Sequence, residues 1–206
     1  MIKCEVSVCA KINRSASVKK SQKDDSEFVT FGIVVPLVGR KKEKLDMEIS
    51  VSLDGGKDVA SVYTTGRRVS VNGTLSIRKK DGKMFFNLRA DRNSIELVKS
   101  TEADRIEGSM EFRGKIKTDG VEEKKDKKEN LYKVFSAFDV DKTDDKVEFI
   151  WVRFLYFNPK EGEDFLAAGQ YIEAKGDLQL GVYREAVSLD CRLKEVAPWE
   201  PPKKKN

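Results

Sequence analysis

The chain has 206 residues, and its 40 lysines and arginines outnumber its 35 aspartates and glutamates, which gives a formal net charge of +5. Hydrophobic residues make up 39% of the sequence, enough for the packed core of one large β domain or two small ones. There is no histidine, the commonest general base and zinc ligand, no run of 18 apolar residues and no apolar N-terminal leader, so we expect a cytoplasmic protein without a membrane span.

The first predicted strand covers residues 1–12, where apolar side chains alternate with polar ones. Cys4 and Cys9 are five positions apart, and this odd spacing places their thiols on opposite faces of a strand. Cys191 is in phase with the apolar positions of the last predicted strand. We therefore expect three free, reduced and buried cysteines.

Strands with the same alternation are predicted in both halves of the chain. In the first half they lie near residues 1–12, 27–38, 45–53, 67–78 and 84–97, and in the second half near 108–117, 131–140, 145–157, 170–180 and 183–196. Between the third and fourth strands of each half we expect a short helix, at residues 56–63 and 161–168. Gly66 and Gly169 follow these segments, where a left-handed helix end requires glycine.

The two halves are predicted to be copies of one unit. Gly66 and Gly169 are 103 residues apart, and so are Gly73 and Gly176, with apolar positions between them in the same phase. Gly73 and Gly176 are expected to permit the sharp bend of a strand in a small barrel. Beyond them, the match assumes a turn two residues longer in the first copy, which aligns residues 86–90 with residues 187–191.

A five-stranded barrel with a helix between its third and fourth strands is the OB architecture. The predicted fold class is therefore all-β, with two tandem OB folds. We expect a first, basic domain at 1–98, a polar linker at 99–107, a second domain at 108–197 and an extended tail rich in proline and lysine at 198–206.

The strand at 146–157 is unusual because both of its faces are apolar. One face carries Ile150, Val152, Phe154 and Tyr156, and the other carries Phe149, Trp151, Arg153, Leu155 and Phe157. Exposed rings can stack on nucleic-acid bases, and a cation can lie beside the phosphates. Tyr183, just past the next strand, would extend this surface. The alternative is that these rings are buried in a subunit interface or against the other unit.

Charge and aromatic residues are distributed unequally. Residues 1–103 have a net charge of +7 and five aromatic residues, whereas residues 104–206 have a net charge of −2 and thirteen. One hypothesis joins the two: a nucleic-acid strand stacks on the second unit and follows basic loops of the first. The candidate cations are Arg67, Arg68, Arg78, Lys79 and Lys80, the cluster Arg40–Lys42, and Lys175 in the second unit. Each cluster is otherwise explained as a solvated face or hairpin tip.

Catalytic and metal-binding motifs are not evident. The turn sequences at 54–56 and 81–82 lack the Gly-Lys-Ser/Thr that would hold a triphosphate, and the aspartates at 139–145 lack the glycine of a calcium loop. We therefore expect no enzyme activity, no metal and no cofactor.

The second unit, from Met110 to Val196, resembles the bacterial single-stranded DNA-binding protein (SSB) family, in a diverged form with two OB folds. The resemblance lies in a Trp-x-Arg-x-x-x-Phe strand at Trp151, Arg153 and Phe157, followed by the spaced glycines of the repeat. It implies sequence-independent binding of single-stranded DNA in replication, recombination or repair. It also implies base stacking on Trp151, Phe157 and the aromatic Tyr183, with Arg153 as the strand arginine.

The first unit departs from this pattern, since Glu48 and Asp54 stand where the repeat places Trp151 and Phe157. The resemblance to double-OB members implies a homo-oligomer, a dimer of such chains. Recruitment of enzymes by the family's acidic tail is not expected, because the sequence ends in lysines and an asparagine. Two other functions stay open: an OB-fold module that holds other proteins in an assembly, and binding of single-stranded RNA.

Overall fold

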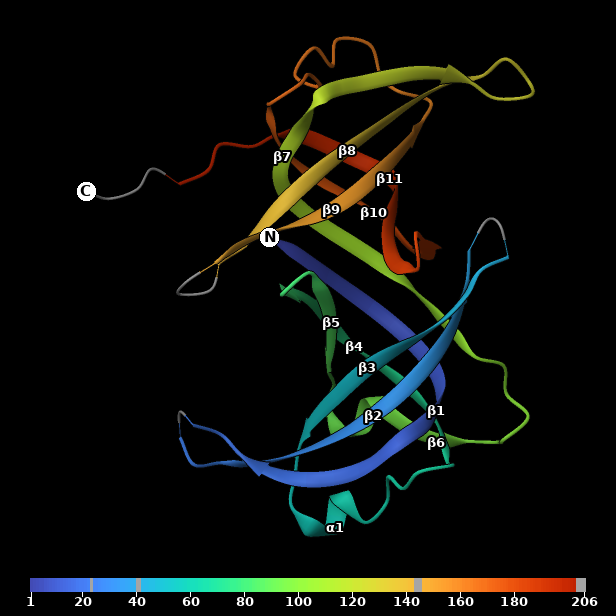
Figure 1. The fold of residues 1–206 in the computed structure, drawn as a ribbon, viewed down its shortest axis with the longest axis vertical. Helices are drawn as coiled ribbons and strands as arrows, with labels where there is room; N and C mark the ends of the chain where they lie inside the picture. The colour runs from blue at the N-terminus through green and yellow to red at the C-terminus, as the bar shows by residue number, and fades with distance from the viewer. Residues whose placement is uncertain (23, 40–41, 143–145, 203–206) are drawn as a thin grey trace.

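The computed structural model describes residues 1–22, 24–39, 42–142 and 146–202. It contains two β-barrels, one above the other in Figure 1. The strands of the lower barrel are β1 (Ile2–Lys20), β2 (Glu27–Val38), β3 (Lys44–Asp54), β4 (Arg68–Lys80) and β5 (Lys83–Arg89). The strands of the upper barrel are β7 (Arg105–Lys125), β8 (Leu131–Lys142), β9 (Val147–Phe157), β10 (Tyr171–Tyr183) and β11 (Ala186–Pro198). The all-β class and the tandem OB folds are thereby confirmed.

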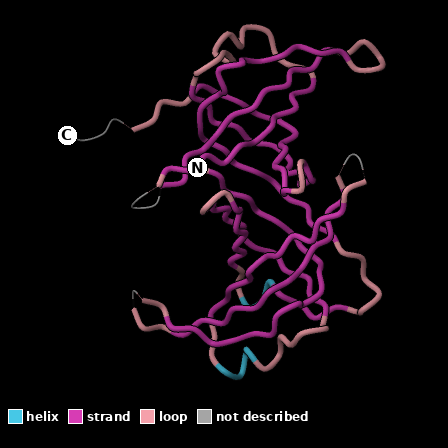
Figure 2. The backbone as a smooth tube through the Cα atoms, in the orientation of Figure 1, coloured by secondary structure: helices cyan, strands magenta, loops and turns pink. Residues whose placement is uncertain are grey.

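Both barrels have the same connectivity. The lower one runs β1-β2-β3-β5-β4 and closes through pairing of β1 with β4, and the upper one runs β7-β8-β9-β11-β10 and closes through β10 and β7. The lower barrel is the first along the chain, and the upper barrel is the second. The first barrel is followed by a 3-10 turn, η1 (Arg92–Ser94), and by the short strand β6 (Ile95–Val98), which pairs with β4. Strands dominate the backbone (Figure 2).

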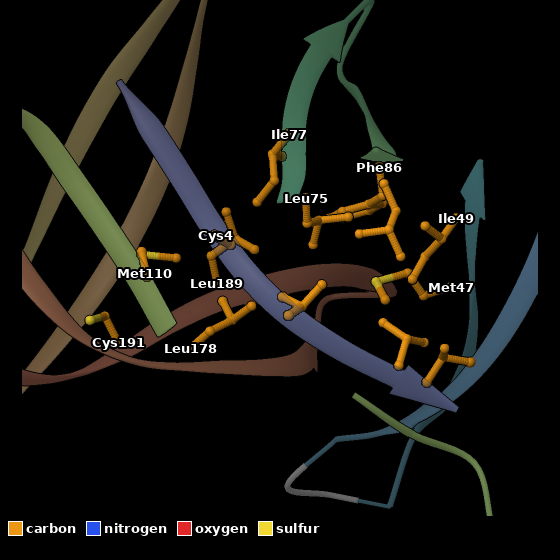
Figure 3. Close-up of a cluster of buried hydrophobic side chains, with 14 of the residues drawn as sticks. Cys4, Met47, Ile49, Leu75, Ile77, Phe86, Met110, Leu178, Leu189 and Cys191 are labelled. Atoms are coloured by element: carbon orange, nitrogen blue, oxygen red, sulfur yellow. The ribbon is translucent and has the colours of Figure 1, made fainter. Parts of the chain in front are cut away.

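The core follows from the alternation along each strand. On β4 the inward positions Val69, Val71 and Leu75 are completely buried, and Ile77 is 5% exposed. Figure 3 shows the side chains of both barrels meeting on either side of β1, with Leu75 and Phe86 from the lower barrel and Met110 and Leu178 from the upper one. Burying these aliphatic and aromatic groups supplies the main stabilising term of the fold.

The two copies keep one offset throughout. On β5, Phe86 lies opposite Ile77, and on β11, Leu189 lies opposite Leu180. These equivalent pairs are separated by 103 residues, so the expected turn of unequal length is wrong. Both hairpins turn through two residues of positive φ, Asp81 and Gly82 in one copy (51° and 76°) and Arg184 and Glu185 in the other (50° and 62°).

Only one of the two expected helices forms. The first copy has α1 (Lys57–Ala60), whereas residues 161–168 of the second copy form turns. Gly162 adopts a φ of +77°, which interrupts a helix, and the Tyr156 hydroxyl donates to Glu163 Oε1 at 2.8 Å. This anchor holds the segment in a turn. Within the described residues no helix is both long and apolar enough to cross a membrane.

The repeated glycines have two structural roles. Gly66 and Gly169 have φ of 93° and 78°, so the expected left-handed conformation is present. They do not cap helices, however, because their N–H groups donate to Ile12 O at 3.0 Å and Ile116 O at 3.1 Å and return the chain to the barrel. At Gly176 a Cβ would lie 2.2 Å from Arg192 O, so strand pairing is possible there only without a side chain.

The three cysteines are free and buried, as expected. Burial raises the pKa of the Cys4 and Cys191 thiols to about 12 in each case. Both thiols are therefore protonated and unreactive at neutral pH.

A continuous antiparallel ladder joins the barrels. β1 pairs with β7 from Ile2 opposite Phe112 to Cys9 opposite Arg105. β7 begins at Arg105, inside the stretch 99–107 that the sequence suggests as a linker, so the strand that opens the second barrel is already paired with the first. The division into domains stays a prediction, and residues 203–206 of the expected tail lie outside the described residues.

Candidate nucleic-acid interface

The outer surface of β8 and β9 in the upper barrel carries a row of large apolar side chains. Register places Phe138 opposite Trp151, Val140 opposite Phe149, and Tyr132 opposite Phe157. Phe149, Trp151 and Phe157 are 42%, 43% and 38% exposed. We call this surface, formed by Tyr132, Phe138, Phe149, Trp151 and Phe157, the aromatic face. It is exposed because the alternate side chains of β9, from Ile150 to Tyr156, fill the barrel.

The rings form two clusters at the two ends of β9. Phe138 contacts both Phe149 and Trp151, with ring centroids 5.1 and 5.0 Å apart. At the other end, Tyr132 stacks on Phe157 at 5.3 Å with planes inclined by 22°. These contacts restrict the rings before any ligand arrives, which lowers the entropy cost of stacking on them.

Arg153 lies between the two clusters and is held by Asp190 of β11. Its Nε donates to Asp190 Oδ1 at 3.1 Å, and its Nη2 pairs with Oδ2. The two side chains are 33% and 19% exposed. This bidentate geometry orients the guanidinium and compensates its charge, so Arg153 contributes a fixed group to the face rather than a net positive charge.

A second arginine reaches the face from β11. Arg192 lies opposite Leu155 of β9, and its guanidinium lies 5.2 Å from the centre of the Phe157 ring. Arg192, Tyr132 and Phe138 are not among the residues predicted from the sequence. Their places on the outward phase of predicted strands could have identified them, since Phe135 and Cys191 mark the inward phase.

Tyr183 is more isolated. It is 62% exposed, and the Arg184 guanidinium lies 5.2 Å from its ring centre. β11 runs parallel to β9 with Leu189 opposite Val152, and Tyr183 lies opposite Ala186 at the start of β11. The register therefore places Tyr183 at the Phe149 end of the barrel, across two strands from the aromatic face.

The structure brings one of the candidate basic clusters to the aromatic face. Lys79 Nζ donates to the backbone oxygen of Phe149 at 3.2 Å, which places the hairpin containing Arg78, Lys79 and Lys80 at one end of the row of rings. Lys42 is exposed on the β2–β3 connection. Arg40 and Lys41 lie outside the described residues.

The other candidate cations have partners elsewhere. Arg67 Nη1 donates to Val62 O at 3.0 Å, and Arg68 forms an ion pair with Asp104. Lys175 Nζ lies 3.2 Å from Glu111 Oε1. Within the described residues, no hydrogen bond or ion pair joins these three side chains to the aromatic face. Nor do any three His, Cys, Asp or Glu residues of that part of the chain gather as metal ligands.

The equivalent surface of the lower barrel is polar. Asp46, Glu48 and Asp54 occupy the positions of Phe149, Trp151 and Phe157 at the 103-residue offset. Glu48 Oε1 accepts a hydrogen bond from Asn13 Nδ2 at 2.9 Å, and Asp54 forms an ion pair with Arg89 at 2.5 Å. A groove over this surface is lined by Asn13, Arg14, Asp46 and Glu48 together with apolar side chains such as Met47 and Phe85. The three positions that carry exposed rings in the upper barrel therefore offer no base-stacking surface here.

Two closed OB barrels in one chain, one of them bearing an aromatic outer face, define the architecture. Solved structures of the single-stranded DNA-binding protein from Thermus aquaticus have the same fold. The wild-type structure matches with a TM-score of 0.52 and 12% identity, over 98% of this chain and 96% of its own. A deletion mutant matches with a TM-score of 0.51 and 15% identity, over 98% of each chain.

A complex of the Plasmodium falciparum protein SSB with single-stranded DNA covers 46% of this chain and 92% of its own, at 17% identity and a TM-score of 0.36. No protein-family model and no curated protein matches the sequence. The two Thermus aquaticus structures confirm the resemblance to single-stranded DNA-binding proteins for the fold, over nearly the whole chain.

Proposed function

We propose that this chain binds single-stranded DNA without strong sequence preference, by stacking bases on the aromatic face of β8 and β9. The observation that carries the proposal is the exposure of Phe149, Trp151 and Phe157, each close to two fifths, on one surface of one strand. The shared fold with the Thermus aquaticus protein supports it. Replication, recombination and repair, which produce single strands, are the processes in which we propose that it acts.

The chemistry of the face suits this ligand. Every base has a flat π surface, so a ring that stacks on one base also accepts the others, at about 1–3 kcal/mol per base. Two clusters separated along β9 would hold two or more bases of one strand. Arg153 and Arg192 lie beside the rings, where a phosphate between stacked bases would pass. Duplex DNA presents its bases edge-on and would not offer these stacking surfaces.

The direct test is the fluorescence of Trp151. The chain has two tryptophans, so a Trp199→Phe variant leaves Trp151 as the only indole. Titration with oligo(dT) should quench this fluorescence. When the logarithm of the affinity is plotted against the logarithm of the salt concentration, the slope should be about −0.7 for each phosphate contacted. In the same background, Trp151→Ala, followed by anisotropy of labelled oligo(dT), should weaken binding about 10- to 100-fold.

Two matched variants control for the loss of a ring. Trp151→Phe keeps a stacking surface and should retain most of the affinity. Tyr171→Ala removes a ring that is 39% exposed on β10, outside the aromatic face, and should leave the affinity within about twofold.

Other outcomes would replace the proposal. Unchanged fluorescence together with an affinity that does not vary with salt would exclude base stacking on Trp151. Equal affinity for oligo(rU) would extend the function to RNA. Absence of any nucleic-acid response, with an oligomer in gel filtration that protects Trp151 from quenching by acrylamide, would favour the protein-interaction module.

A further inference from the structure

The lower barrel is anchored to the rim of the aromatic face by a set of polar contacts. The basic hairpin, residues 78–83, consists of the end of β4, the turn at Asp81 and Gly82, and the start of β5. It meets the end of β8 and the start of β9 between the two barrels (Figure 1). The residues in contact are 62 to 70 positions apart in the sequence. The contact therefore belongs to the tertiary structure and not to any local motif.

Asp141, near the end of β8, is the centre of this contact. It is 7% exposed and is the only buried polar or charged residue in the part of the chain that the structure describes. Both of its oxygens face the basic hairpin: Arg78 Nη1 donates to Oδ1 at 2.9 Å, and the backbone N–H of Lys79 donates to Oδ2 at 2.9 Å. A buried carboxylate is stable only with such partners.

Three further contacts join the basic hairpin to the same ends of β8 and β9. Glu148 accepts from the backbone N–H of Gly82, at 3.1 Å to Oε1, and Lys146 Nζ lies 2.5 Å from Asp81 Oδ1. Lys79 Nζ donates to Phe149 O at 3.2 Å. Asp141 and Glu148 lie directly opposite each other in the β8–β9 ladder, next to the pair of Val140 and Phe149. The basic hairpin is thus fixed one residue from the first exposed ring.

The docked hairpin retains positive charge. Arg78 is compensated by Asp141, but the Lys79 ammonium binds an uncharged carbonyl oxygen. Lys80 and Lys83 are both exposed and form no ion pair with any described residue. Ammonium groups at the Phe149 end of the aromatic face would meet the phosphates of a strand that continues past the last stacked base.

We propose that Asp141 is a positioning residue that makes the nucleic-acid site composite, by holding Lys80 and Lys83 of the first barrel beside the aromatic face of the second. The inference rests on the proposed function. Asp141 itself touches no ligand. It acts by docking the hairpin, so that one strand stacks on the second barrel and is neutralised by lysines of the first.

The experiment measures how the affinity for oligo(dT) depends on salt in four proteins: wild type, Asp141→Asn, the double variant Lys80→Ala with Lys83→Ala, and all three substitutions together. The lysine variant should lose about 1.4 from the slope, 0.7 for each phosphate contact. Asp141→Asn should lose a similar amount in the wild-type background, because the undocked hairpin carries its cations, including the released Arg78, away from the bound strand. In the lysine variant, adding Asp141→Asn should change the slope little, because the phosphate contacts that Asp141 supports are those of Lys80 and Lys83, which are already removed.

Two controls separate positioning from general loss of structure. Asp54→Asn breaks an exposed ion pair with Arg89 in the same barrel, away from the hairpin, and should leave the slope unchanged. With Trp199→Phe added to each protein, the quenching of Trp151 at saturation should be the same in all variants, since the stacking surface is intact. If Asp141→Asn does not fold, Glu148→Gln, which weakens the exposed anchor at Gly82, replaces it in the same cycle.

Three results would overturn the inference. The lysine variant could keep the wild-type slope while Trp151→Ala still weakens binding, in which case the strand does not reach the hairpin. Asp141→Asn could act additively with the lysine substitutions, or could keep the wild-type slope. Loss of the Trp151→Ala effect is a different result, because it removes the proposed function itself.

Discussion

At the centre of the aromatic face one arginine is neutralised by one aspartate. The Arg153–Asp190 pair is partly buried, and its bidentate geometry fixes the guanidinium between two groups of rings. An orienting carboxylate at this position also opposes the approach of a phosphate. The ion pair therefore fixes the position of the guanidinium but weakens its attraction for a phosphate.

Asp190→Asn should tighten the binding of oligo(dT). The amide keeps the shape and one acceptor for Arg153, while the face gains one unit of positive charge. The salt dependence should become steeper by up to about 0.7, the value for one additional phosphate contact. Asp54→Asn makes the same change of charge in the first barrel and should not alter the slope. Weaker binding by Asp190→Asn would mean that the orientation of Arg153 matters more than its charge.

At the scale of the strand, single glycines set how closely neighbouring strands can approach. Gly176→Ala should destabilise the protein by about 1–3 kcal/mol, because the added Cβ would lie 2.2 Å from Arg192 O and 2.7 Å from Cys191 Sγ. Gly181→Ala is the matched control on the same strand, since its Cβ meets only Ser188 Oγ, at 3.1 Å. Urea unfolding followed by tryptophan fluorescence measures both, and equal midpoints would contradict the assignment.

The strands were predictable because their inward and outward positions alternate clearly, as on β4. The turn between Lys80 and Lys83 was not, and the reason is the period of a strand. A shift of two residues returns every side chain to the same face, so aligning residues 86–90 with residues 187–191 preserved the apolar pattern and concealed the error. Only the observed pairing of Phe86 with Ile77 reveals the common offset.

The helix predicted at 161–168 does not form, and part of the site was not predicted, for another reason. Leu166, Ala167 and Ala168 favour a helix, but Gly162 and the hydrogen bond from Tyr156 to Glu163 override that local preference. Phe149, Trp151 and Phe157 could be placed on one exposed surface from their spacing alone. Their long-range partners, such as Asp190, could not, because no local pattern reports which strands become neighbours.

At the scale of the molecule, the two barrels share a ladder and a set of polar contacts, so we expect them to unfold together. Leu88 is completely buried in the first barrel, and Leu88→Ala should cost about 2–5 kcal/mol. Both tryptophans, Trp151 and Trp199, belong to the second half of the chain. The transition that they report should nevertheless shift with this substitution, in step with far-ultraviolet circular dichroism.

The barrels would instead unfold independently if Leu88→Ala left the unfolding transition seen by tryptophan fluorescence unchanged and circular dichroism showed two steps. Val152→Ala, in the core of the second barrel, provides the reciprocal measurement. With this variant the transition seen by tryptophan fluorescence should shift whether the barrels unfold together or independently. Such a shift would confirm that the fluorescence reports on the stability of the second barrel.

The ladder between β1 and β7 has a consequence for self-association. From Cys4 to Cys9, the backbone of β1 is hydrogen-bonded to β4 along one edge and to β7 along the other. A second molecule finds no unpaired strand there to extend into an intermolecular sheet. If two chains associate at this place, they must do so through side chains alone, because the main-chain groups of β1 are already paired within one polypeptide.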